Sequence, residues 1–526
     1  MRHAVSELKK IKLTCVSRWF LWLGLLLRTI QYLYNKSVWH DEAVAAVQLS
    51  VHPFSKLQYP LPSSGGAYLY MLLQKSMLAV FGMNELALRF FPYFFSCASV
   101  IVFYLFMKRQ GSAMLTALTV FMFSTSDNLI YYAAEFRQYS FDVFVAVAIL
   151  YGFSVLSTQP IPSRRVWLGL GFGGASLIWL SHISVIVLFC CGCVYLLGVI
   201  TGPSDVSLKR MLSFVSMTAV WMLSFVSHYF FSIIHWLQSP LTGSFAYYRG
   251  LYQYLYFPMH SVSEFLFNIA QLFRLLCFFI GLRLTPFKLV LSDFFPVQMD
   301  VLYQAVQTHW ISVAYIVLLC ALTGGMLVFG SRVLLRENRY LWGVTLLPVL
   351  LMMGLSGFEK YPFLGRHLLF LFPFLIVMVS TAFLELYRLR KKVGVVALVF
   401  FMIQPTFAAA YHVVEPRCLL TIRPALERIA SQFGPSDKII LFGNREVLTF
   451  YEERFGFSEA TVLRSRSHHD VPEWETGFWV VSINDPAVDA YVAGLKQVKG
   501  YQVWEMDYPE DAAVWLYYFG KGEGER

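Results

Sequence analysis

The sequence becomes mainly apolar at residues 17–35, SRWFLWLGLLLRTIQYLYN, directly after a basic N-terminus. A helix of this length is enough to cross the hydrocarbon core of a bilayer. Working outward from it, further runs of spanning length lie at 87–107, 113–131, 139–157, 166–181, 183–201, 211–232, 309–330, 341–356, 364–386 and 394–413. The fold class is therefore predicted to be mainly α, a polytopic membrane helical bundle of about 11 spans.

The composition is typical of a membrane protein. Hydrophobic residues make up 57% of the 526 residues and charged residues only 14%, which is far from the usual composition of a soluble domain. No small-residue cleavage site follows the first run, so we expect it to be retained as a span and not removed as a signal peptide.

Charge divides the chain into two parts. Residues 415–526 contain 12 Lys and Arg against 18 Asp and Glu, which gives −6, whereas the preceding residues carry +16. Such a shift indicates a separate domain. We predict a transmembrane module over 1–413 and a soluble α/β domain over 414–526. In the second domain strands are expected at 438–442, 477–483 and 513–519, with helices at 424–433, 446–454 and 487–496.

The distribution of Lys and Arg predicts the orientation. Clusters of these residues precede the first span and recur in every second loop of an eleven-span arrangement, and such clusters face the cytoplasm. We therefore expect a multi-pass protein of the cell (inner) membrane with a cytoplasmic N-terminus and an extracytoplasmic C-terminal domain. Loops 36–86 and 233–308 are expected to hold interfacial helices. In an alternative, residues 265–282 cross the membrane and break the alternation.

An acidic pair, Asp41-Glu42, follows the first span in the string SVWHDEA, residues 37–43. Acidic residues are scarce before residue 415, where there are only 14, and an ionised carboxylate facing lipid is costly. One interpretation is a general base or metal-binding carboxylate at the membrane boundary. The other is a helix start, with Asp41 as the cap and Glu42 favoured by the helix dipole. Spacing alone leaves both open.

A second polar group lies in a short loop expected on the outer side. If a helix begins there, Glu135, Gln138, Tyr139 and Asp142 form one polar stripe that runs into the membrane. A stripe of this kind must face a cavity or another helix. The pattern is consistent with a ligand site and equally with a buried network that holds helices together.

Basic residues on the same side are candidates for anion binding. Lys360, Arg366 and His367 occur close together, and Arg suits bidentate binding of phosphate. The alternative is that Arg366 extends along the apolar surface to the interface. His182 lies in the turn between the fifth and sixth runs, where a lone histidine is either structural or a ligand contact.

Four motifs in this order resemble the GT-C-fold glycosyltransferases that use polyprenyl-phosphate sugars. The nearest likeness is to the protein O-mannosyltransferase-like and aminoarabinose-transferase-like bacterial group. The motifs are the aromatic-x-Asp-Glu string at 39–42, GMNELALRF at 82–90, EFRQY at 135–139 and the Gly-Arg-His segment at 365–373. The resemblance covers about residues 15–410.

The resemblance implies a transferase that takes a sugar from an undecaprenyl- or dolichyl-phosphate carrier. The acceptor is an extracytoplasmic glycan, lipid or protein, as in cell-envelope glycan biosynthesis. Asp41 matches the carboxylate that activates the acceptor, with Glu42 beside it, and Arg366 would meet the carrier phosphate. With the loop residues added, the expected substrate-binding set is Glu135, Arg137, Tyr139, His182, Lys360 and Arg366.

The expected reaction is an inverting single displacement with Asp41 as base. A divalent ion held by Asp41 and Glu135 is left open, no other cofactor is expected, and the expected partners are the donor lipid, the acceptor and membrane lipids, without nucleic acid. The chain lacks the Arg after the acidic pair and the Lys before a Pro-Pro step that aminoarabinose transferases carry, at 43–46 and 59–62. The alternatives are a transporter or flippase of lipid-linked sugars and a non-catalytic scaffold.

Overall fold

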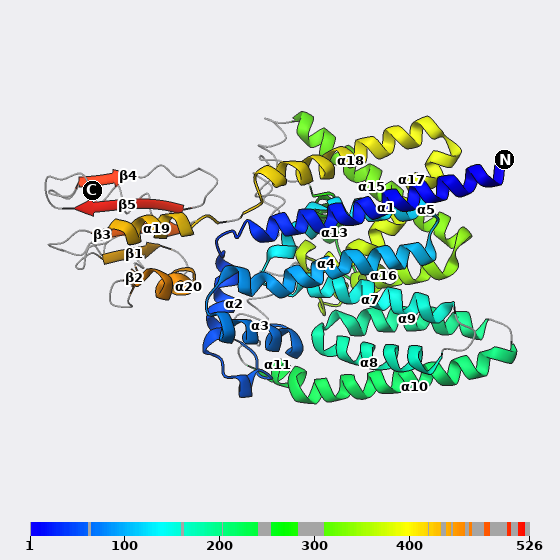
Figure 1. Ribbon diagram of the computed structural model, residues 1–526, viewed down its shortest axis with the longest axis horizontal. Coiled ribbons are helices and arrows are strands. Elements are labelled where there is room, and N and C mark those ends of the chain that lie inside the picture. The colour runs from blue at the N-terminus through cyan, green and yellow to red at the C-terminus, as the bar shows by residue number, and fades with distance from the viewer. Residues whose placement is uncertain are drawn as a thin grey trace. The chain divides into compact units, whose positions relative to one another are not determined.

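The computed structural model describes the chain except for residues 1, 62–64, 159–162, 202–203, 240–253, 282–309, 419, 433–437, 443–444, 458–461, 465–477, 484–501, 506–513 and 521–526. The chain forms two compact units, shown in Figure 1. We call the first the helical unit; it comprises Met1–Leu33, Phe54–Gln74 and Arg89–Pro416. The second, the sheet unit, comprises Tyr34–Pro53, Lys75–Leu88 and Arg417–Arg526. The sheet unit thus includes two segments from the predicted transmembrane module.

Helices dominate the described chain up to residue 414. They are α1 (Arg2–Leu33), α2 (His40–Val51), η1 (Phe54–Lys56), α3 (Tyr68–Phe81), α4 (Glu85–Gln110), α5 (Ala113–Thr125), α6 (Asp127–Tyr131), η2 (Tyr132–Ala134), α7 (Tyr139–Ser157), α8 (Arg164–Leu180), α9 (Ile183–Ile200), α10 (Ser204–His228), η3 (Tyr229–Ile233), α11 (Ile234–Gln238), α13 (Val262–Ile280), α15 (Trp310–Glu337), α16 (Arg339–Gly357), η5 (Gly365–Leu371), α17 (Phe372–Leu389) and α18 (Lys391–Val414).

The predicted membrane helical bundle is confirmed. Within the described residues, 10 helices are long and apolar enough to cross a membrane, or 11 if the bent pair Ala113–Thr125 and Asp127–Ala134 is one span. The assignment differs from the expected one at two helices. α8 has 17 residues and falls outside this group, whereas α13 meets the length and hydropathy of a span. Length and composition therefore support the alternative in which this segment crosses.

The core of the helical unit is built around α17. Every residue from Phe372 to Leu384 is buried, because the helix is apolar on all sides and other helices cover it. α5, α15 and α18 all pack against it. Gly330 of α15 allows the closest approach, since a Cβ at this position would lie 1.9 Å from the carbonyl oxygen of Met378.

A buried arginine joins three helices of this unit. Arg28 of α1 is completely buried and donates hydrogen bonds to Ser96 Oγ of α4 at 3.0 Å and to the carbonyl oxygen of Phe123 of α5 at 3.2 Å. It also donates to the carbonyl oxygen of Gly24 in its own helix at 3.0 Å. A guanidinium inside a span needs such acceptors to offset its desolvation. Arg28 therefore has a structural role in holding α1 to α4 and α5.

The sheet unit contains a five-stranded sheet in the order β2-β1-β3-β5-β4. β1 pairs in parallel with β2 and β3, while β5 pairs antiparallel with β3 and β4, and Ile440 lies opposite Val480. The strands are β1 (Lys438–Phe442), β2 (Val462–Arg464), β3 (Phe478–Ile483), β4 (Gln502–Glu505) and β5 (Val514–Gly520). Two helices, α19 (Arg423–Gln432) and α20 (Arg445–Phe455), accompany the sheet, and α2 packs against α20.

The predicted α/β character of the C-terminal part is confirmed. Three expected strands correspond to β1, β3 and β5, and two expected helices to α19 and α20. β2 and β4 were not predicted, because runs of 3 and 4 residues carry too little periodic signal. The helix expected at 487–496 lies outside the described residues.

We expect Gly330→Ala to destabilise the helical unit, because the new methyl group forces α15 away from the backbone of α17. Overpacking of this kind costs about 1–3 kcal/mol. The measurement is the thermal unfolding temperature and the monodisperse yield of detergent-purified protein. Gly325→Ala on the same helix is the control, since a Cβ there meets nothing within 4 Å. Equal stability of the two variants would contradict the close-packing argument.

Candidate functional site

The acidic pair lies in the first turn of α2, in the sheet unit. The helix begins at His40, and the carboxylate of Glu42 accepts a hydrogen bond from the backbone N–H of Trp39 at 3.5 Å. This is the reach-back contact of a capping box, in which the third helical residue satisfies the backbone before the helix. The helix therefore starts earlier than expected, and Glu42, not Asp41, makes the capping contact. Glu42 is fully buried, while Asp41 is half-buried.

The opposite end of α2 is held by a lysine. Lys75 Nζ donates hydrogen bonds to the carbonyl oxygens of Leu49, at 2.9 Å, and Ser50, at 2.6 Å. These carbonyls lie in the last turn of the helix, where a cation is favoured by the helix dipole. Burial lowers the pKa of the Lys75 ammonium group. Both ends of the helix that carries Asp41 are thus fixed by buried side chains.

A buried carboxylate, Glu85, connects the remaining parts of the sheet unit. Glu85 is 1% exposed and pairs with Arg423 Nη1 at 3.0 Å and Arg454 Nη1 at 3.4 Å. It also accepts a hydrogen bond of 3.0 Å from the hydroxyl of Tyr451. The same hydroxyl accepts a hydrogen bond of 3.1 Å from the backbone N–H of Val38. Glu85 therefore fixes the chain three residues before Asp41 through a single intervening side chain.

We expect Glu85→Gln to destabilise the folded protein by about 3 kcal/mol, because the neutral amide leaves two arginines without their buried counter-charge. The measurement is the unfolding temperature in detergent. Glu427→Gln is the matched control: Glu427 is 50% exposed and reaches the same arginines only at 3.9 and 3.8 Å. Exposed pairs of that kind contribute little. A loss in the Glu427 variant as large as that in the Glu85 variant would argue against the buried network.

In the helical unit, the structure corrects the predicted polar stripe. α7 begins at Tyr139, with Gln138 as its N-cap, whereas Glu135 precedes it in an extended conformation with φ −127° and ψ 127°. Glu135 therefore does not share a helix face with Tyr139 and Asp142. The segment between η2, which ends at Ala134, and α7 is not helical, so the continuous helix that the stripe requires is missing. Glu135 is fully buried.

The structure brings the second and third groups of predicted residues together. The ring of Tyr139 lies edge-on to the ring of His367, with 5.6 Å between centroids and an interplanar angle of 87°. The hydroxyl of Tyr361 donates to the carbonyl oxygen of His367 at 3.2 Å. Arg366 is half-buried next to this histidine, and Lys360 is exposed in the preceding loop. The phenol of Tyr139 and the segment that carries Lys360 and Arg366 therefore lie in one part of the helical unit.

His182 contacts a second histidine that sequence analysis did not single out. Its ring is stacked on that of His228 at 5.5 Å with an interplanar angle of 8°. His228 is fully buried, and neither of its ring nitrogens has a hydrogen-bond partner among the described residues. It was missed because it lies at the end of a long apolar run, where a lone polar residue gives no motif. Trp179 also packs on His228, with 4.7 Å between the two ring centroids.

A third polar residue extends this histidine cluster. Asp142 accepts a hydrogen bond of 2.5 Å from Ser181 Oγ, and Ser181 directly precedes His182 in the chain. Asp142 is 3% exposed. A buried carboxylate needs such a donor to offset its desolvation. The network interpretation of this part of the predicted stripe is therefore supported by an observed contact.

Stability is expected to fall in acid because His182 is buried in its neutral form. Burial lowers the pKa of His182 to about 4, and a hydrogen bond with the Gly66 backbone opposes this only in part. Between the unfolded value of 6.5 and about 4, the unfolded chain binds a proton that the folded chain does not, so stability is lost as the pH falls through this window. The full effect is about 3 kcal/mol.

The measurement is the unfolding temperature in detergent between pH 7 and about pH 4.5. We expect His182→Gln to show a smaller loss over this window than the unmodified protein. His260→Gln, at an exposed histidine, is the control and should keep the original pH dependence. An unchanged pH dependence in His182→Gln would show that this residue does not carry the effect.

No metal centre is evident in the described part of the chain, where no group of three or more His, Cys, Asp or Glu side chains is placed to hold an ion. Neither Asp41 nor Glu135 belongs to such a group among the described residues.

Comparison with solved structures finds several proteins of similar fold. The crystal structure of ArnT from Cupriavidus metallidurans bound to undecaprenyl phosphate is 13% identical, with 95% of this chain and 97% of that chain covered and a TM-score of 0.49. The Archaeoglobus fulgidus oligosaccharyltransferase in complex with Zn and sulfate is 12% identical, with 88% and 68% covered and a TM-score of 0.48. AglB from the same organism, in complex with an inhibitory peptide and a dolichol-phosphate, is 12% identical, with 96% and 74% covered and a TM-score of 0.45.

No protein-family model and no curated protein matches the sequence. The chain is thus similar to ArnT and to an oligosaccharyltransferase over most of its length, at low identity. At these values the likeness assigns no activity to the chain.

Proposed function

We propose that the chain is a membrane glycosyltransferase that moves a sugar from a polyprenyl-phosphate carrier to an extracytoplasmic acceptor. The observation that carries the proposal is the division of roles in the acidic pair. Glu42 is buried and makes the capping contact of α2, so helix capping does not account for Asp41, which is half-buried directly after the first apolar run. A carboxylate at a membrane boundary suits the activation of a hydroxyl.

The proposed reaction is a single displacement with inversion. The acceptor hydroxyl oxygen attacks the anomeric carbon of the donor sugar and forms the new glycosidic bond, while Asp41 accepts the hydroxyl proton. The bond between the anomeric carbon and the phosphate oxygen breaks in the same step, and the polyprenyl phosphate leaves with the electron pair. Positive charge is required where this phosphate leaves.

Arg366 is the proposed partner of the leaving phosphate, assisted by Arg137 or Lys360. A guanidinium binds phosphate oxygens in a bidentate manner, and the exposed Lys360 suits an incoming charged headgroup. The contact between Tyr139 and His367 would hold the segment that carries Arg366 in place. Asp41 belongs to the sheet unit and Arg366 to the helical unit.

Glu135 and His182 complete the proposed substrate-binding set. Both are buried or half-buried polar residues close to the beginning of α7 and α9. The Lys and Arg cluster that precedes the first span supports a cytoplasmic N-terminus, and we propose that the reaction takes place on the other side of the cell membrane. The undecaprenyl and dolichol phosphates held by the two similar structures belong to the carrier class proposed here.

We expect Asp41→Asn to lower transfer by about 10²–10⁴-fold, the usual contribution of a general base. The assay measures release of free polyprenyl phosphate from a panel of polyprenyl-phosphate sugars in membranes that supply the native acceptor. Equal amounts of monodisperse protein must be confirmed for each variant. Ser50→Ala, in the last turn of the same helix, is the control and should retain activity.

Full activity of Asp41→Asn would contradict its role as base. Arg366→Ala should lose more activity than Arg366→Lys, because lysine keeps the charge but not the bidentate contact. Addition of EDTA to the same assay tests a divalent ion directly. If the unmodified protein releases no polyprenyl phosphate across the panel, while it moves labelled lipid-linked sugar across reconstituted vesicles, the transporter alternative replaces the transferase.

A further inference from the structure

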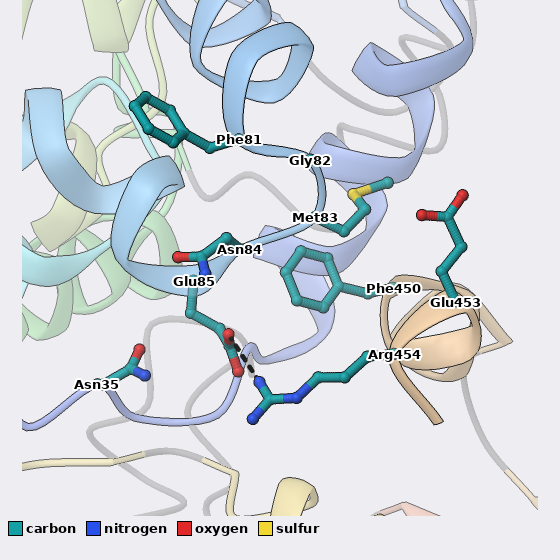
Figure 2. Close-up of a pocket in the computed structure, with 9 residues that line it drawn as sticks. All are labelled: Asn35, Phe81, Gly82, Met83, Asn84, Glu85, Phe450, Glu453 and Arg454. Carbon is teal, nitrogen blue, oxygen red and sulfur yellow. Dashed lines mark hydrogen bonds and ion pairs between the residues drawn. The ribbon is translucent and has the colours of Figure 1, made fainter. Parts of the chain in front are cut away.

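The sheet unit contains a cavity of about 430 Å³ between the start of α4 and the helix α20. Figure 2 shows the ring of Phe450 and the side chain of Arg454 projecting from α20 toward residues 82–85, where Arg454 meets the carboxylate of Glu85. Asn35 and Asn84 contribute amide groups to the lining. The size is that of a pocket for a small molecule or part of a larger one.

The charges of the lining disfavour an anion. Among the described residues, the charged side chains of the lining are Glu85 and Glu453, which are acidic, and Arg454, which is basic. Arg454 already pairs with Glu85 at 3.4 Å and with Glu427 at 3.8 Å. Without surplus positive charge, the cavity is poorly suited to bind phosphate or a carboxylate. A neutral polar ligand fits this balance better.

The hydrogen-bonding groups of the cavity match a ligand that both donates and accepts. The carboxylate of Glu453 only accepts, the guanidinium of Arg454 only donates, and the amides of Asn35 and Asn84 do both, so a hydroxyl has a partner on each side of the cavity. Asn35 also lines the cavity, and its buried Oδ1 has no hydrogen-bond partner among the described residues. A buried polar atom of this kind requires an explanation such as a bound ligand or water. Phe450 supplies an apolar face beside these groups.

We propose that this cavity binds a neutral saccharide, namely a part of the acceptor glycan that does not itself react. A sugar ring presents hydroxyl groups around its edge and C–H groups on its face, which correspond to the polar groups and the aromatic ring of the cavity. The assignment to the acceptor rests on the proposed function. It is supported within the sheet unit, because α20, which supplies Phe450 and Arg454, packs against α2, which carries Asp41.

Two variants test the cavity without breaking the Glu85 network. Asn35→Gly removes the amide and keeps the left-handed backbone, since Asn35 has φ 51° and glycine adopts this conformation freely. Met83→Trp fills the cavity with a larger side chain, because Met83 belongs to its lining. Glu446→Gln is the control on the same helix α20 but outside the lining.

The full-length protein in detergent is offered an array of neutral oligosaccharides built from hexoses, N-acetylhexosamines and pentoses. We expect binding of at least one class by the unmodified protein and by Glu446→Gln. For Asn35→Gly and Met83→Trp we expect the affinity to fall by at least about tenfold, which is equivalent to about 1.4 kcal/mol. Their unfolding temperatures should match that of the unmodified protein.

Absence of binding across the array, or undiminished binding by both variants, would overturn the proposal. The outcome is independent of the transferase assay. Saccharide binding that depends on the cavity, combined with full activity of Asp41→Asn, would keep the binding site and remove the proposed base. Transfer that depends on Asp41, combined with no binding on the array, would keep the transferase and remove the site.

Discussion

The sheet unit depends on the contacts of one buried side chain, the carboxylate of Glu85. Its partners come from the C-terminal part of the chain, and through Tyr451 it reaches the backbone of Val38. A carboxylate in this position is costly unless charged and hydrogen-bonded partners surround it. Here two arginines and a hydroxyl meet that requirement. The position of α2, and with it that of Asp41, is therefore linked to residues hundreds of positions later in the chain.

Buried polar groups in the helical unit fall into two kinds. Arg28 has hydrogen-bond acceptors on three helices and holds them together. His228, in contrast, is buried with no hydrogen-bond partner for its ring nitrogens among the described residues, and it stacks on His182. The first kind is accounted for by packing. The second is where a bound molecule or water is needed to complete the interactions.

The two proposals assign different tasks to neighbouring helices of the sheet unit. α2 carries the proposed base, and α20 supplies an aromatic ring and a guanidinium to a cavity without surplus positive charge. In a transfer between two large substrates, binding energy from parts of the acceptor that do not react contributes to positioning the reacting hydroxyl.

The sequence by itself determined the helical, membrane-spanning character of most of the chain and most elements of the C-terminal sheet. Those features follow from local composition: long apolar runs form spanning helices, and short apolar runs such as 438–442 form buried strands. The local pattern also led to a wrong prediction. The polar stripe that includes Glu135 requires a helix that already contains this residue, whereas the helix begins only at Tyr139.

Only the tertiary structure decided which residues contact one another. It showed that Glu42 makes the capping contact, that Tyr139 packs on His367, that His182 has His228 as its neighbour, and that Glu85 pairs with Arg423. Each contact except the first connects residues far apart in sequence. Such pairs leave no periodic signal, because they are selected by packing and charge complementarity after the local elements have formed.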